Sequence, residues 1–225
     1  MVFSRGRAVS SIVGVALAGF CVAGVRPLAA DQDHTRAIAG QDIQVVFVQP
    51  QIPFKIPSLG GALLGAVGQF AVDRPAGAAV VERYGITDSA LRVRDTFLAD
   101  IAQDMSRVKT IQAFRDSDNI SKLKTDLGSA GYALEFRSIL TNVLPFMGDG
   151  KHQRIEYWVR ARLIRLDSGS VVWRDTAKFL GNAPKGQRPT PDEMMANGAA
   201  VLKEKLNEAA DACAHDLARN FRALK

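Results

Sequence analysis

The feature that most constrains the fold is a pair of alternating segments, residues 153–166 and 170–180, separated by Asp167-Ser168-Gly169. The alternation of apolar and polar residues predicts two strands that each bury one face. A three-residue loop that ends in glycine is typical of a β-hairpin, because glycine adopts the left-handed conformation that this position needs. The sequence therefore predicts an antiparallel hairpin near the C-terminus.

The length of the loop decides the register of the hairpin and therefore which side chains share a face. With a three-residue loop, Leu166 lies opposite Ser170, and one face is apolar except for Asp175. This predicted core face consists of Tyr157, Val159, Ala161, Leu163, Val171, Trp173, Ala177 and Phe179. A two-residue loop would place Asp167 opposite Ser170 and would mix both faces, so we favour the three-residue loop.

The opposite face of the hairpin is the candidate binding surface, and we call it the basic face. It consists of Arg154, Trp158, Arg160, Arg162, Arg174 and Lys178. Glu156 is the only acidic residue of the hairpin on this face. Arg162 lies opposite Arg174, and like charges across a strand pair destabilise a sheet by up to roughly 1 kcal/mol. A carboxylate from elsewhere in the chain or an anionic partner would therefore offset the repulsion between the two arginines. The alternative is that this face is an ordinary solvated surface.

A second pattern predicts a long amphipathic helix at the C-terminus. Thr190 supplies an N-cap, Pro191 fits the first helical position, and Glu193 completes a capping box. Apolar residues then recur every three or four positions. The predicted buried stripe is Met195, Leu202, Leu206, Ala209, Cys213, Leu217 and Phe221. Within this stripe Cys213 acts as a small buried apolar residue.

Shorter patterns place the remaining elements. Thr87 is the predicted N-cap of the first helix, and the glycines at 128 and 131 end the second helix. The predicted strands span residues 43–48, 108–114 and 132–140, and the predicted helices span residues 90–105 and 120–127. We therefore predict an α/β (α+β) fold. It has a single mixed, largely antiparallel sheet with a C-terminal β-hairpin, covered on one face by helices that include the long C-terminal helix.

The first 30 residues have the layout of a secretory signal peptide. Two arginines precede an uncharged, mostly apolar stretch, and Leu28-Ala29-Ala30 offers small residues for cleavage after Ala30. An uncleaved membrane anchor is one alternative. Lipidation of Cys21 is another, because residues 17–21 (LAGFC) resemble the bacterial lipobox with one phenylalanine inserted. Each reading places the body of the protein outside the cytoplasm, and we expect a periplasmic protein that is free or tethered to a membrane.

The rest of the chain divides into an N-terminal segment and an α/β domain. Residues 31–86 hold a strand, a proline-rich connector and an apolar, glycine-rich stretch over 60–72, and residues 87–225 form the domain. The formal net charge is +6, and half of it comes from three arginines of the signal. Neither this mild charge nor the compartment favours nucleic acid as a partner.

No motif for catalysis or metal binding stands out. His34, His152 and His215 have no metal-ligand spacing, and the carboxylates are scattered. We therefore expect no enzyme, no cofactor and no metal site. A periplasmic hydrolase that uses His152 is the remaining enzymatic alternative.

The order of elements resembles small α/β modules of bacterial envelope proteins. The resemblance spans residues 91–224 and is carried by residues 128–136 (GSAGYALEF) and 168–173 (SGSVVW). Such modules occur in penicillin-binding-protein activator lipoproteins and in the N-terminal domain of the Tol-Pal β-propeller protein. The resemblance implies an accessory or scaffolding role with an envelope protein as partner. A module that binds anionic lipid headgroups at a membrane surface is the alternative.

Overall fold

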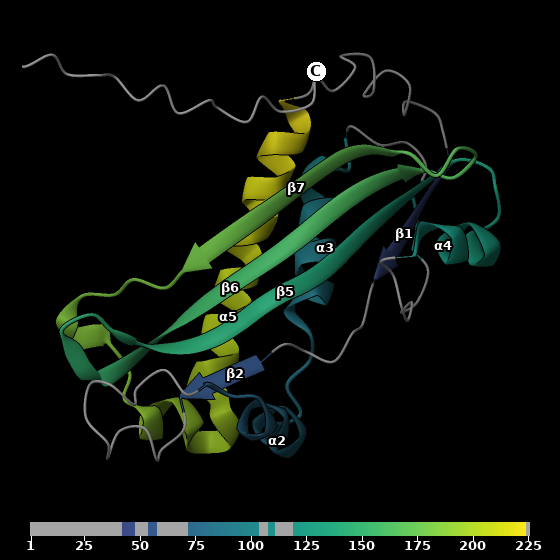
Figure 1. Ribbon diagram of the computed structural model, residues 1–225. Coiled ribbons are helices and arrows are strands. Elements are labelled where there is room, and N and C mark those ends of the chain that lie inside the picture. Colours follow the sequence, from purple (N-terminus) through teal and green to yellow (C-terminus); the bar gives the residue numbers. More distant parts are fainter. Residues whose placement is uncertain (1–41, 48–53, 58–71, 104–107, 111–118, 224–225) are drawn as a thin grey trace, which may run out of the picture.

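The computed structural model describes residues 42–47, 54–57, 72–103, 108–110 and 119–223 (Figure 1). The predicted signal peptide, with Cys21 and the cleavage site at Ala30, lies outside the described residues. The glycine-rich stretch before Val72 also lies outside them.

A mixed sheet forms the middle layer of the fold, and its longest pairings are antiparallel (Figure 1). The central meander consists of β5, β6 and β7, and the other edge of β5 pairs in parallel with β1 near its start and with β2 further along. The strands are β1 (Ile43–Phe47), β2 (Phe54–Pro57), β3 (Val72–Asp73), β4 (Val108–Thr110), β5 (Tyr132–Phe146), β6 (Asp149–Arg165) and β7 (Val171–Leu180). The prediction of a mixed, largely antiparallel sheet is therefore confirmed.

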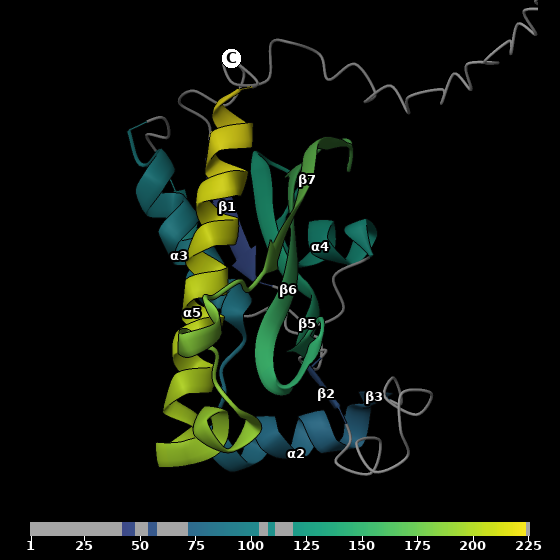
Figure 2. The same cartoon turned by 90° about the vertical axis from the view of Figure 1, so that its left-hand side faces the viewer.

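Two helices, α3 and α5, pack on one face of this sheet, and α4 packs on the other face at one end (Figure 2). The helices are α2 (Arg74–Tyr84), α3 (Ser89–Ile101), α4 (Ile120–Leu127) and α5 (Pro191–Arg222), and a short 3₁₀ helix covers Lys185–Gln187. The predicted long C-terminal helix covers the predicted face of the hairpin. The central part of the opposite face of β5, β6 and β7 is covered by no described helix (Figure 1).

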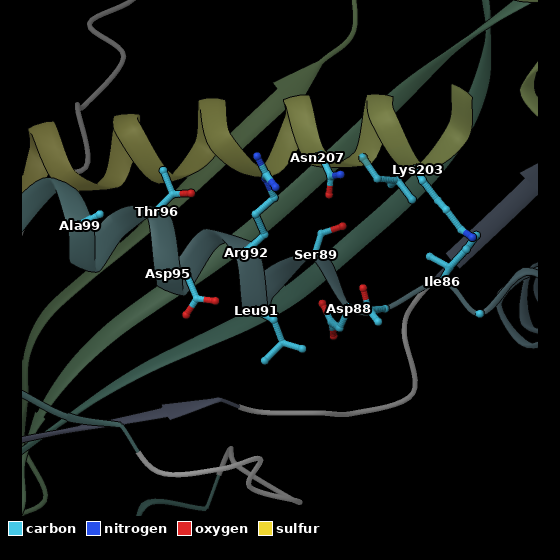
Figure 3. Close-up of a pocket in the computed structure, with 13 residues that line it drawn as sticks. Ile86, Asp88, Ser89, Leu91, Arg92, Asp95, Thr96, Ala99, Lys203 and Asn207 are labelled. Atoms are coloured by element: carbon cyan, nitrogen blue, oxygen red, sulfur yellow. The ribbon is translucent and has the colours of Figure 1, made fainter. Parts of the chain in front are cut away.

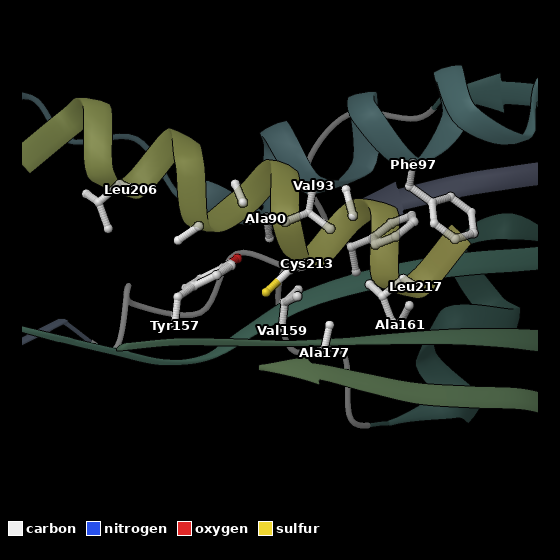
Figure 4. Close-up of a cluster of buried hydrophobic side chains, with 14 of the residues drawn as sticks. Ala90, Val93, Phe97, Tyr157, Val159, Ala161, Ala177, Leu206, Cys213 and Leu217 are labelled. Atoms are coloured by element: carbon white, nitrogen blue, oxygen red, sulfur yellow. The ribbon is translucent and has the colours of Figure 1, made fainter. Parts of the chain in front are cut away.

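The main core lies between the sheet and the two helices α3 and α5 (Figure 4). Tyr157, Val159 and Ala161 of the predicted core face are fully buried there. Phe97 of α3 packs edge-on against Phe221 of α5, with 5.7 Å between the ring centroids. Phe97 and Phe221 also pack against Trp173 of β7, so both helices cover the apolar face of the hairpin.

The predicted hairpin register is confirmed along most of β6 and β7, and Arg162 lies opposite Arg174. A bulge between Leu163 and Ile164 then shifts the pairing by one residue near the turn. There the N–H of Arg165 donates to the carbonyl oxygen of Ser170 at 2.9 Å, so the prediction that Leu166 lies opposite Ser170 across a three-residue loop was wrong. As a result, the prediction that Val171 belongs to the core face was wrong. A one-residue shift moves a side chain to the other face, and Val171 packs beneath α4.

Two helix starts differ from the sequence prediction. Asp88, rather than Thr87, caps α3, because its Oδ1 accepts a hydrogen bond from the backbone N–H of Ala90 at 2.9 Å. The capping box at the start of α5 is confirmed, but residues 196–199 leave the helical conformation. This interruption rotates the first turn, so Met194 is buried in the core while Met195 is only half-buried.

Candidate functional site

All six residues of the basic face lie on the side of the sheet that faces away from α3 and α5. Trp158 pairs with Lys178, and Arg162 pairs with Arg174, so the two strands present these side chains together. The neighbouring Val159 of β6 is buried on the helix side. The structure therefore brings the predicted residues onto one face, although their exposure differs widely.

Glu135 of β5 supplies the carboxylate that the sequence predicted near the facing pair Arg162 and Arg174. It lies opposite Arg162 on β6 and is completely buried. Its Oε2 accepts a hydrogen bond from Nε of Arg162 at 3.0 Å and a second from Nη2 of the same side chain. Its Oε1 accepts a hydrogen bond from Nη2 of Arg160 at 3.1 Å. Arg162 is only 4% exposed, so its charge is satisfied inside the sheet and is not offered to a ligand.

The other residues of β6 are also partly engaged. The Arg160 side chain is 19% exposed and shares Glu135 with its neighbour. The guanidinium of Arg154 lies 5.5 Å from the centroid of the Phe146 ring. Trp158 is half-buried and carries Nζ of Lys178 above its ring, 4.1 Å from the centroid. Cation–π contacts of this kind contribute about 0.5–1 kcal/mol at exposed sites, and they fix the directions of both side chains.

Accessible positive charge is therefore concentrated on β7. Arg174, Thr176 and Lys178 are exposed, and Leu180 at the end of the strand is 51% exposed. No acidic side chain of the described residues forms an ion pair with Arg174 or Lys178. Among the described strands, β7 pairs only with β6 and forms an edge of the sheet. The sequence predicted the face, but not that its exposed bases lie on an edge strand.

A groove of about 600 Å³ lies on the opposite side of the molecule, between α3 and α5 (Figure 3). Arg92 of α3 lines it and forms two hydrogen bonds of 2.7 Å with the carboxylate of Asp211 on α5. Lys203 and Asn207 extend from α5 towards α3. The ion pair ties the two helices together, so we regard this groove as a helix junction rather than as the principal site.

A buried polar chain joins the start of α3 to the sheet. Ser138 Oγ donates to Asp88 Oδ1 at 2.5 Å and lies 2.8 Å from the hydroxyl of Tyr157. Burial raises the pKa of Asp88, although the hydrogen bonds from Ser138 and from the backbone N–H of Ala90 oppose this effect. Ser138 and Tyr157 are 2% and 0% exposed. This chain therefore holds α3 in place and does not present a nucleophile to a substrate.

His152 and His215 each contact one carboxylate. Nδ1 of His152 lies 2.8 Å from Asp149, and Nδ1 of His215 lies 2.6 Å from Asp100. The hydrogen bond with His152 lowers the pKa of Asp149. In the part of the chain that the structure describes, no group of three or more His, Cys, Asp or Glu side chains is arranged to hold a metal ion. None of the described helices is both long and apolar enough to cross a membrane.

No protein-family model matches the chain, and no curated protein has a matching sequence. Solved bacterial structures show a partial similarity. A DUF330-family protein from Xanthomonas campestris is 11% identical, with 79% of this chain and 81% of that chain covered and a TM-score of 0.38. PelC from Paraburkholderia phytofirmans, a dodecamer, is 13% identical, with 76% and 87% covered and a TM-score of 0.26.

Lipoprotein GNA1162 from Neisseria meningitidis is 14% identical, with 64% of this chain and 88% of that chain covered and a TM-score of 0.25. None of these three proteins is named as a penicillin-binding-protein activator or a Tol-Pal propeller protein, so that finer resemblance stays a prediction. At these TM-scores the similarity is limited to part of the fold and shows neither a family nor a function.

Proposed function

We propose that this chain is an exported protein of the bacterial envelope, located in the periplasm, that acts as an accessory protein without catalysis. In this role it binds an acidic surface of another envelope protein through the basic face. The exposed pair of bases on β7, Arg174 and Lys178, carries the proposal, since neither has an acidic partner among the described residues. The signal peptide predicted over residues 1–30 supports the location, and lipidation at Cys21 would add a membrane tether.

The number of accessible bases favours a protein over a lipid surface. Clusters of roughly 4–8 lysines and arginines are typical of segments that bind anionic membranes, with about 1 kcal/mol from each base. On the basic face only Arg174 and Lys178 are fully exposed, while Arg162 is buried on Glu135. Two bases four residues apart on a strand are separated by about 13 Å, which suits two carboxylates on one protein surface.

The proposal is tested with two anionic probes. Poly-L-glutamate stands for an acidic protein surface, and phosphatidylcholine vesicles with or without phosphatidylglycerol stand for the membrane. We expect the purified protein to bind poly-L-glutamate at low salt, and we expect the affinity to fall as salt is added. Binding to the phosphatidylglycerol vesicles without binding to poly-L-glutamate would replace this proposal by the lipid-binding alternative.

Charge-reversal variants locate the site. The double variant Arg174→Glu/Lys178→Glu should bind poly-L-glutamate at least about ten-fold more weakly, since a ten-fold loss corresponds to only 1.4 kcal/mol. The control Arg83→Glu/Lys185→Glu changes the net charge equally at two exposed bases outside the basic face. Retained binding by the first variant, or an equal loss in both, would contradict the proposed site.

A further inference from the structure

We propose that the partner binds by strand addition: an extended segment with acidic side chains at alternate positions pairs with the edge of β7 that no described strand covers. This inference rests on the proposed function, because it assigns a binding mode to the same basic face. It goes beyond charge attraction, because main-chain hydrogen bonds along the edge would supply affinity while the side chains supply specificity.

The backbone of β7 offers a row of donors and acceptors on its outer side. The N–H of Gly181, just after β7, donates to the carbonyl oxygen of Ile155 on β6 at 2.7 Å and therefore points inward. Because directions alternate along a strand, the N–H groups of Arg174, Thr176 and Lys178 point outward. The N–H of Thr176 accordingly bonds to Oδ1 of Asp175 at 2.7 Å rather than to β6. Over ten residues, the edge is long enough to hold a short strand.

The charges of the basic face coincide with this edge. Arg174, Thr176 and Lys178 have outward N–H groups and also have side chains on the basic face. Side chains of an added strand that lie directly opposite them would come within about 5 Å. A segment with carboxylates opposite Arg174 and Lys178 would therefore make two ion pairs and several main-chain hydrogen bonds at once.

The same charges argue against a second copy of this chain as the added strand. In the antiparallel register centred on Thr176, Arg174 of one copy would lie opposite Lys178 of the other copy, and this contact would occur twice. Like charges directly opposite one another destabilise a strand pair. The edge is therefore suited to an acidic partner and unsuited to self-association.

In the protein without a partner, the Asp175 side chain occupies the outward N–H in the middle of the edge. Its Oδ1 accepts from the N–H of Thr176, while its Oδ2 accepts from Nδ2 of Asn220 on α5 at 2.8 Å. An incoming strand has to replace the first of these bonds. The alternative is that the bases and Asp175 only protect the edge from aggregation, as charged residues on edge strands commonly do.

The test uses a fluorescent ten-residue peptide of five Glu-Val repeats and measures its binding to the full protein by fluorescence polarisation. Two control peptides keep every side chain and charge, but one is N-methylated at all glutamates and the other at all valines. In a strand, N–H groups of alternate residues point to opposite sides. We therefore expect one methylated peptide to bind at least about ten-fold more weakly than the parent, and the other to bind like the parent.

Two protein variants give an independent measurement. Thr176→Pro removes an outward N–H and leaves the pairing with β6 intact, because proline is tolerated where an edge N–H faces solvent. It should bind the parent peptide at least about ten-fold more weakly. Asp175→Ala frees the N–H of Thr176 and removes a negative charge, so it should bind more tightly. The thermal midpoint of each variant reports its fold, and the methylated peptides test the native protein should Thr176→Pro fail to fold.

The outcomes separate this inference from the proposed function. Equal binding of all three peptides, together with a loss in Arg174→Glu/Lys178→Glu, would overturn strand addition and leave the acidic-surface proposal standing. Unchanged binding by the charge-reversal variant would overturn both. Absence of peptide binding under conditions where poly-L-glutamate binds would assign the edge charges to protection and would also overturn strand addition.

Discussion

Replacement of Glu135 by glutamine should destabilise the protein far more than most single substitutions. The carboxylate is fully buried and accepts hydrogen bonds from Arg160 and Arg162, and Arg162 is itself only 4% exposed. Glutamine has nearly the same shape but no charge. The change therefore removes the charged carboxylate that Arg162 shares with Arg160 inside the sheet, and Arg174 lies directly across the strand pair from Arg162.

The magnitude follows from this burial. Removal of one partner from a buried ion pair costs about 3–5 kcal/mol, because the remaining charge has lost its compensation. A domain of this size loses roughly 2–4 °C of thermal midpoint per kcal/mol. We therefore expect Glu135→Gln to lower the midpoint by about 6–20 °C, with a matching fall in the urea midpoint at pH 7 and an unchanged m-value.

The control is Glu156→Gln, which alters the other acidic residue on the same face. Glu156 is only half-buried and accepts one hydrogen bond from Asn142 Nδ2 at 2.7 Å, so its loss should cost about 1 kcal/mol. The double variant Glu135→Leu/Arg162→Met removes both charges and should recover most of the stability. A loss below about 1 kcal/mol for Glu135→Gln, or one equal to that of the control, would refute the reasoning.

Three further predictions concern other parts of the fold. Gly131→Ala should lower the thermal midpoint, because this residue has φ +80° and the added Cβ would lie 2.5 Å from the carbonyl oxygen of Asp42. The hydrogen bond from Arg92 lowers the pKa of Asp211 below its ordinary 3.8, so this carboxylate stabilises the fold at neutral pH and ceases to do so on acidification. The difference in unfolding free energy between the native protein and Asp211→Asn should therefore be present at pH 6 and shrink as the pH falls below about 4. Burial raises the pKa of Cys213 to about 12, so its thiol should react with Ellman's reagent only after unfolding.

The hairpin shows what local sequence patterns determine. Alternation along two segments was enough to predict that Arg162 lies opposite Arg174, although the loop between them is one residue longer than predicted. The bulge between Leu163 and Ile164 was not predictable in this way, because alternation does not show where one strand holds an extra residue. The error was confined to the last pairs before the turn, where Val171 changed faces.

Glu135, the carboxylate beside the facing arginines, shows where local patterns fail. The sequence predicted a carboxylate near Arg162 but did not identify Glu135 as that residue. The pairing of β5 with β6 contains two irregularities, between Ser138 and Leu140 and between Pro145 and Phe146. Counting residues outward from the turn therefore gives the wrong register, and only the packed sheet places Glu135 opposite Arg162.

The order of the strands decides which bases a partner can reach. β6 is flanked by β5 and β7, so its side chains on the basic face are crowded from both sides, and Arg162 is buried there although no described helix covers it. Among the described strands, β7 has a neighbour on one side only, and Arg174 and Lys178 are exposed. Both strands show the same alternation in sequence, so this pattern does not predict which of them lies at the edge of the sheet. A partner attracted by the exposed bases therefore meets, at the same place, a main-chain edge that no described strand covers, and this coincidence favours strand addition over contact with the flat face.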